Sequence, residues 1–170
     1  LFFTREGYFK KITPQSLRMS GEQKLKEGDT ITQICESTNA HELLFFTDRH
    51  QVYKSRVADF ADGKASVLGD FVAGKLEFDE GESACYMVNT RTYEGFMLFV
   101  YDNGRISKVP LSSYATKTNR KKLIKAYSEK YKLHTVLFIR EETELLLKST
   151  SGRMLIVNTA VLPAKTTKNR

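Results

Sequence analysis

Short apolar runs recur along the chain, and a tight turn and a second strand-like segment follow each of them. The four runs begin at Leu1, Leu44, Leu98 and Leu146. In the second and third repeats, residues 44–46 and 96–100 are apolar at successive positions rather than at alternating ones. A strand of this kind is buried on both faces. The pattern therefore predicts small β-sheets stacked face to face.

The runs belong to a repeat with a common register. Aligning the four copies places one turn residue of each in a single column, made up of Gly7, His50, Gly104 and Gly152. Four residues later, three copies carry a lysine, and ten residues later every copy carries an apolar side chain. The lysines of this column are Lys11, Lys54 and Lys108, and the fourth copy has Ile156. Such self-similarity decides the architecture before any single motif does.

The turn column predicts a β-hairpin at the start of each repeat. Asn103-Gly104 is a strong two-residue hairpin signal, since a type I′ turn needs positive φ at both central residues. Glu6-Gly7 and Ser151-Gly152 are weaker versions, and His50 tolerates positive φ better than most residues. A second turn is shared by the first two copies, at residues 25–29 and 78–82.

These features predict an all-β, propeller-like fold of repeated sheets, because radial repetition buries both faces of each sheet. The repeats span residues 1–40, 41–94 and 95–142, with an incomplete fourth at 143–170, so three to four blades of a partial disc are expected. Residues 119–132 also show helix-like spacing of apolar side chains. The repeat register favours an extended segment there.

Length and cysteine content fit one domain in a reducing compartment. The 170 residues can bury roughly 70% of the unfolded surface. Cys35 and Cys85 lack metal-binding spacing and are too few for a disulfide framework. No apolar run approaches the roughly 18 residues that span a bilayer, and Leu1 begins directly in a strand-like pattern. We expect a soluble, cytoplasmic chain without a membrane partner, cut from a longer protein.

Charge favours an anionic partner. The net charge is +7, and residues 96–140 carry ten cations and two carboxylates. Metal-site, nucleophile-elbow, P-loop and dinucleotide-binding motifs are absent from the sequence. This predicts neither catalysis, cofactor, metal nor small-molecule substrate. A protein-binding scaffold remains the alternative, with the acidic residues 77–82 as its contact, although a solvated turn explains that segment as well.

The hairpin pattern of residues 1–11 and the turn of residues 25–29 resemble the C-terminal repeats of the A subunits of DNA gyrase and topoisomerase IV. The resemblance covers essentially the whole chain. It implies a β-pinwheel, a propeller-like disc of four-stranded blades that exchange strands, around whose basic edge double-stranded DNA bends without sequence preference. It also implies that catalysis lies elsewhere in an ATP-dependent parent enzyme, and that the partners are the ATPase B subunit together with the rest of the A subunit.

Two departures from the family pattern matter. The family usually has five or six blades. Gyrase carries a glutamine-arginine-arginine-glycine-glycine-lysine-glycine box, and residues 18–24 are only a degenerate relative of it. The resemblance therefore implies a parent closer to topoisomerase IV than to gyrase, or a box outside this chain.

Wrapping DNA needs cations spread over a surface, each of which neutralises a phosphate and releases a counterion. The lysine column supplies equivalent positions in successive repeats, and the densest cluster lies in residues 117–125, with a counterpart one repeat later. Solubility alone also explains exposed lysines, but the register favours binding. The expected DNA-contacting residues are Lys11, Lys54, Lys108, Lys117, Arg120, Lys121, Lys122, Lys165, Lys168 and Arg170.

Overall fold

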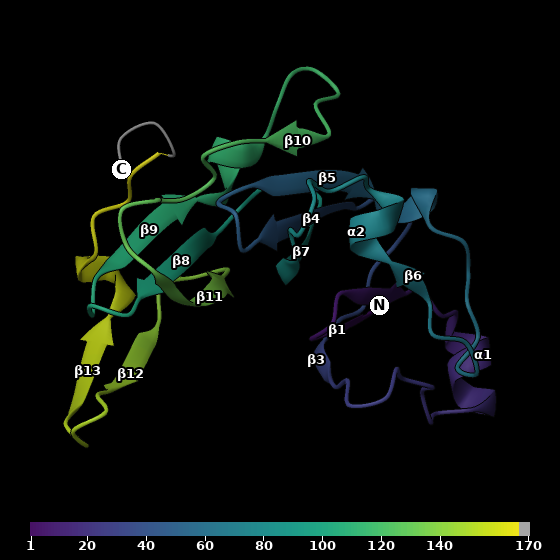
Figure 1. Ribbon diagram of the computed structural model, residues 1–170. Coiled ribbons are helices and arrows are strands. Elements are labelled where there is room, and N and C mark those ends of the chain that lie inside the picture. Colours follow the sequence, from purple (N-terminus) through teal and green to yellow (C-terminus); the bar gives the residue numbers. More distant parts are fainter. Residues whose placement is uncertain (167–170) are drawn as a thin grey trace. The chain divides into compact units, whose positions relative to one another are not determined.

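The computed structural model describes residues 1–166 and confirms an all-β fold (Figure 1). The chain divides into two compact units. The first consists of Leu1–Arg91 with Thr118–Ile124, and the second consists of Thr92–Lys117 with Lys125–Arg170. Helices are confined to α1 (Pro14–Met19), α2 (Val72–Lys75) and three short 3-10 turns within the described residues.

The first compact unit contains two antiparallel four-stranded sheets. One has the order β3-β1-β2-β6, and the other has the order β10-β5-β4-β7. The strands of the first sheet are β1 (Phe2–Thr4), β2 (Tyr8–Lys10), β3 (Ile31–Ile34) and β6 (Asp70–Phe71). Those of the second are β4 (Glu42–Thr47), β5 (Val52–Arg56), β7 (Ala84–Thr90) and β10 (Lys122–Leu123).

The second compact unit contains a three-stranded sheet and a hairpin. The sheet has the order β11-β8-β9, and the hairpin pairs β12 with β13. Their bounds are β8 (Phe96–Tyr101), β9 (Ile106–Pro110), β11 (Leu133–Ile139), β12 (Glu144–Lys148) and β13 (Met154–Asn158). A 3-10 turn follows the second strand of three hairpins: η1 (Val57–Asp59), η2 (Leu111–Tyr114) and η3 (Thr159–Val161).

One outer strand of each of the first two sheets comes from the following repeat. Strand β6 belongs in sequence to the second repeat but pairs with β2 of the first. Strand β10 belongs to the third repeat and pairs with β5 of the second (Figure 1). The segment with helix-like spacing, residues 119–132, therefore contains β10 and turns and no α-helix. The register inference is confirmed there.

All four predicted hairpins are present, but the turn type differs from the expectation. Positive φ occurs at the column residues, with 85° at Gly7, 60° at His50, 80° at Gly104 and 82° at Gly152, and not at the residues before them. The amide of Gly104 donates to the carbonyl of Tyr101, three residues earlier, over 2.9 Å. This is a type I turn followed by a left-handed residue, a three-residue hairpin loop. The type I′ prediction at Asn103 was wrong because one more residue lies in the loop.

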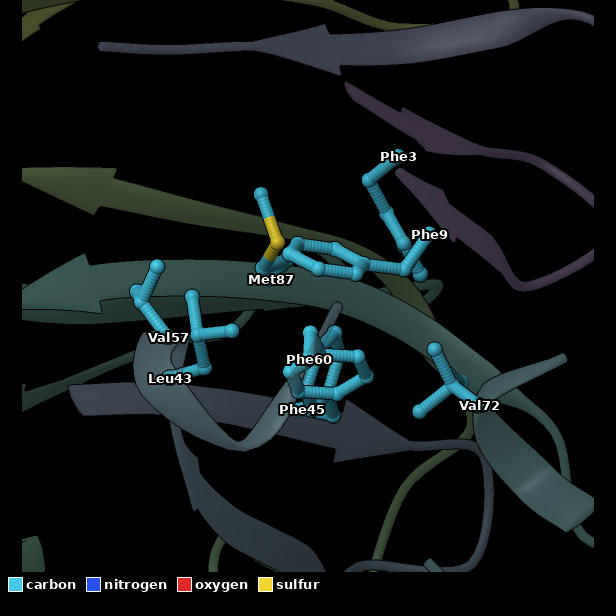
Figure 2. Packing of buried hydrophobic residues seen from close by; sticks show 9 residues of the cluster. Phe3, Phe9, Leu43, Phe45, Val57, Phe60, Val72 and Met87 are labelled. Carbon is cyan, nitrogen blue, oxygen red and sulfur yellow. The ribbon is translucent and has the colours of Figure 1, made fainter. Parts of the chain in front are cut away.

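The core of the first compact unit lies where its hairpins pack (Figure 2). Phe45 of β4 contacts the rings of Phe3 and Phe9 at centroid distances of 5.7 and 6.0 Å, and Phe60 approaches Phe9 to 4.4 Å. Residues 43–46 are all fully buried, so β4 is covered on both faces as predicted. Each such side chain contributes roughly 1.5–3 kcal/mol through burial.

Candidate nucleic-acid interface

The lysine column is a structural column as well as a sequence column. In the β4–β5 and β8–β9 hairpins, Lys54 lies opposite Leu44 and Lys108 lies opposite Leu98. Lys11 has the corresponding position beyond the end of β2, where it bridges to Asp62. The aligned positions in the sequence are therefore equivalent positions in space within their hairpins.

Each column lysine faces a carboxylate. The Nζ atom of Lys11 lies 3.3 Å from Asp62, that of Lys54 lies 3.7 Å from Glu42, and that of Lys108 contacts Glu142. Their side chains are only 13%, 10% and 4% exposed, respectively. Desolvation lowers the pKa of Lys54, while Glu42 opposes that effect. Little ammonium surface is left for a phosphate, so phosphate contact by this column stays a prediction that the geometry does not favour.

The other expected cations are exposed. Lys117, Arg120 and Lys121 precede Lys122, the first residue of β10, and Lys165 lies near the end of the described chain. All five are exposed to solvent. Lys168 and Arg170 lie outside the described residues. The structure thus separates the expected set into exposed cations and the largely buried lysine column, which we call the buried column. Among the exposed cations, Lys117, Arg120 and Lys121 lie close together in sequence before β10, and we call them the β10 cluster.

Strand β10 is held to β5 by both backbone and side-chain contacts. The amide of Lys54 donates to the carbonyl of Lys121 over 2.7 Å. The ammonium of Lys122 lies 2.6 Å from Oδ2 of Asp79 and 5.6 Å from the centre of the Tyr53 ring. The hydrogen bond from Lys122 also helps to lower the pKa of Asp79, after the larger effect of Gln51. Lys122 is therefore already paired with a carboxylate of the turn that precedes β7.

A buried carboxylate orders the loop that carries Asp79. Glu82 is 5% exposed and accepts hydrogen bonds from the hydroxyls of Thr47 and Tyr53 and from the side-chain amide of Gln51. The backbone amide of Asp79 donates to Oε2 of Glu82 over 3.1 Å. A buried charge is tolerable when several donors satisfy it. The acidic segment 77–82 is thus not simply a solvated turn.

The first sheet contains the counterpart of this carboxylate. Asp29 ends the equivalent turn and accepts from the amides of Glu6 and Thr30 at 3.0 and 2.8 Å. Although burial acts to raise its pKa, hydrogen bonds from Thr4, Glu6 and Thr30 lower it overall. The shared turn motif was visible in the sequence. The role of Asp29, the last residue of that motif, as an acceptor for backbone amides was not predicted, because the spacing of residues does not show where a side chain points.

Lys10 is another buried cation, and its environment is structural. Its ammonium donates to the carbonyls of Lys24, Ala65 and Val67 over 3.1, 3.4 and 3.0 Å. Desolvation lowers its pKa. Lys10 therefore joins the segment that leads to β6 to the first hairpin and has no free face for a phosphate.

Comparison with known proteins gives consistent relatives. The chain is 30% identical over 120 residues to the A subunit of DNA gyrase from Streptomyces coelicolor, which covers 65% of this chain and 14% of that protein. It is 27% identical over 168 residues to the A subunit of DNA topoisomerase 4 from Staphylococcus aureus, covering 95% and 21%. The chain thus spans between about a seventh and a fifth of these relatives. No protein-family model matches it.

Solved structures show the same fold. A crystal structure of the C-terminal domain of DNA topoisomerase IV has a TM-score of 0.80 and 22% identity over 98% of this chain and 53% of that one. The E. coli ParC C-terminal domain has a TM-score of 0.71 and 17% identity over 99% and 69%. The architecture is therefore that of a β-pinwheel.

Together, the sequence relatives and the fold confirm the resemblance. The chain is homologous to the A subunits of the type IIA topoisomerases, DNA gyrase and topoisomerase IV, and has the fold of their C-terminal domains. No helix among residues 1–166 is long and apolar enough to cross a membrane.

Proposed function

We propose that this domain binds and bends double-stranded DNA without reading its sequence, and presents it to the catalytic core of a type IIA topoisomerase. The domain itself supplies no catalytic residue in this proposal. The observation that carries it is the β10 cluster, in which three exposed cations lie within the five residues that lead into β10, the outer strand of a sheet. Phosphate contacts of this kind position a duplex and carry no sequence information.

Direct titration tests this function. A labelled duplex of about 30 base pairs, long enough to bend, would be titrated at several salt concentrations. If one to two phosphates are neutralised per repeat, log K against log[salt] has a slope of about −4 to −7. Duplexes of unrelated sequence should bind equally. A slope near zero, or a marked preference for one sequence, would count against the function and favour a protein-binding scaffold.

Edge protection is the competing explanation for the β10 cluster. Strand β10 is the outer strand of its sheet, and lysines on such edges discourage pairing with another chain. In that case, neutralising Lys117, Arg120 and Lys121 would cause self-association and leave DNA affinity unchanged. Sedimentation of the neutralised variant, measured beside the DNA titration, separates the two roles.

We further propose that the parent enzyme is closer to topoisomerase IV than to gyrase. The support is the degenerate loop at residues 18–24, where the sequence Arg-Met-Ser-Gly-Glu-Gln-Lys stands in place of a gyrase-type box. A topoisomerase IV-like domain should bend DNA without trapping a handed wrap. A nicked plasmid that is resealed by ligase in the presence of a topoisomerase IV-like domain should have the same linking number as one resealed without it. A gyrase-like domain would shift the linking number.

In this function, the partners are the duplex, the ATPase B subunit of an ATP-dependent enzyme, and the remainder of the A subunit, in the bacterial cytoplasm with the nucleoid. Co-purification with tagged B subunit tests the second of these partners. Capture that requires DNA would indicate that the two meet only through the duplex.

A further inference from the structure

The cation cluster directly precedes the exchanged strand β10, which pairs with a different sheet from that of its own repeat. Its backbone is held by pairing over only two residues, Lys122 with Tyr53 and Leu123 with Val52, and by the bond from the Lys54 amide to the Lys121 carbonyl. Short edge elements with few hydrogen bonds open at low free-energy cost. Some further contact must hold the cluster in place.

That contact is the ion pair between Lys122 and Asp79. Oδ2 of Asp79 accepts from Lys122 and also from Gln51, whose side chain is buried and donates to Glu82 as well. The backbone amide of Asp79 donates to the Tyr53 hydroxyl and to Glu82. Asp79 is thus held by Gln51, Tyr53 and Glu82 independently of β10, so the pair joins a short edge strand to an ordered loop.

We propose that Asp79 and Lys122 are positioning residues, which anchor β10 on its sheet and thereby hold Lys117, Arg120 and Lys121 in register with DNA phosphates. This inference rests on the proposed DNA-binding function. It reassigns Lys122 from a phosphate contact to an anchor. It also gives an acidic residue, Asp79, a favourable part in binding a polyanion.

The first sheet shows that the anchor is particular to β10. There the ring of Phe71 in the exchanged strand β6 lies 5.3 Å from that of Tyr8, and the Lys10 ammonium donates to backbone carbonyls of the segment that leads to β6. Tyr8 occupies the repeat position that Gln51 occupies in the second sheet. The β6 strand carries Asp70, which pairs with Lys75 at 3.3 Å, in place of a cation cluster. An ionic anchor thus accompanies the strand that follows the exposed cations.

The sign of one substitution tests the anchor. Asp79→Asn removes a negative charge near the cluster, so general electrostatics alone predicts tighter DNA binding. The anchor predicts weaker binding, by about fivefold, because affinity falls with the fraction of molecules in which the cluster is in place. The salt slope should change by less than about one unit, since the bound state keeps the same phosphate contacts. Glu80→Gln, an exposed position in the same turn, is the matched control.

Two further measurements complete the test. Exchanging the charges in Asp79→Lys with Lys122→Glu should restore affinity without altering net charge. Hydrogen exchange at the Lys54 amide, which donates to β10, should accelerate about fivefold in Asp79→Asn and stay unchanged in Glu80→Gln. Unchanged or tighter binding by Asp79→Asn, an equal effect of Glu80→Gln, or unaltered exchange at Lys54 would overturn the anchor. If the unsubstituted chain binds no duplex, the proposed function fails, and the exchange rate at Lys54 still decides whether β10 is anchored.

Discussion

Two triple variants with the same loss of charge should behave in opposite ways. One neutralises the buried column as Lys11→Met, Lys54→Met and Lys108→Met, which keeps most of each apolar stem. The other neutralises the β10 cluster as Lys117→Gln, Arg120→Gln and Lys121→Gln. If only net charge attracted DNA, the two variants would lose the same affinity. The burial and ion pairing of the column predict that they will not.

For the β10 cluster, the loss appears in DNA binding. Three phosphate contacts contribute about 2.7 units of salt slope, at roughly 0.9 units for each. Between 50 and 200 mM salt, the unsubstituted domain should therefore lose about 40-fold more affinity than the variant. Stability should change by less than about 0.5 kcal/mol per site, since exposed substitutions seldom do more.

For the column, the loss appears in stability. Lys108 donates to the Thr159 carbonyl over 3.0 Å and lies 4.5 Å from the centre of the Phe96 ring, in addition to its contact with Glu142. Losing a hydrogen bond to a charged group costs about 1.5–3 kcal/mol. Lys54 has a longer contact of 3.7 Å and should cost less. Unfolding in urea should show the largest loss for Lys108→Met alone.

Fluorescence anisotropy of a labelled duplex, with urea unfolding of the same preparations, measures both quantities. The buried column would be refuted as a structural element if its triple variant stayed as stable as the parent and flattened the salt slope by about 2.7 units. Measuring each column variant singly guards against a triple variant that does not fold.

Three other predictions follow from the same contacts. Glu82→Gln should destabilise the domain by about 2–3 kcal/mol in urea unfolding, because an NH2 group would replace an oxygen that accepts from Thr47 and Gln51. An unchanged unfolding midpoint would contradict the buried network. Gly69→Ala should lower the free energy of unfolding by about 2–4 kcal/mol, and Gly104→Ala by only about 1 kcal/mol. A Cβ at Gly69 would lie 2.4 Å from the Phe9 carbonyl oxygen, whereas Gly104 faces open space. Equal losses would refute the close approach of the backbone before β6 to Phe9. The pKa of Asp79 is lowered and that of Lys122 is raised. The stabilisation of β10 by this pair should be complete between their ordinary pKa values of 3.8 and 10.5. This stabilisation should fade as the pH falls through the depressed pKa of Asp79 or rises through the raised pKa of Lys122. Hydrogen exchange at the Lys54 amide measures it, and a rate that does not depend on pH after correction for intrinsic exchange would exclude a role of the pair.

The sequence was sufficient for the hairpins, because their signals are local. Apolar runs and a left-handed column residue fix where the chain reverses, and the structure has reversals at Gly7, His50, Gly104 and Gly152. The burial of β4 on both faces also followed from a run of consecutive apolar residues. The turn type did not follow, because a dipeptide such as Asn103-Gly104 fits both a two-residue and a three-residue loop.

Burial of both faces could not be extended to the fourth repeat. The run from Leu146 resembles the earlier ones, yet Leu146 is 64% exposed and Ile156 is 66% exposed. The first strands of the first three hairpins each have a hydrogen-bonded strand on both edges, whereas β12 and β13 pair only with each other among the described residues. An apolar pattern shows which side chains of a strand can be buried, and the elements packed around the strand determine which of them are buried.

The cations show why repeat position alone could not define the interface. Repetition predicted even spacing of lysines, and the register is indeed even at Lys54 and Lys108. The lysines at those positions, however, are largely buried and pair with carboxylates. A buried ion pair in each repeat therefore explains a repeated lysine as well as a phosphate contact in each repeat does. Strand exchange then moves the exposed cations of the third repeat onto the second sheet, while the equivalent strand of the first sheet carries Asp70. Exposed charge in a strand-exchanged repeat must therefore be counted by sheet rather than by repeat, and counted that way it is uneven: the segment that leads into β10 is basic, whereas β6 carries Asp70.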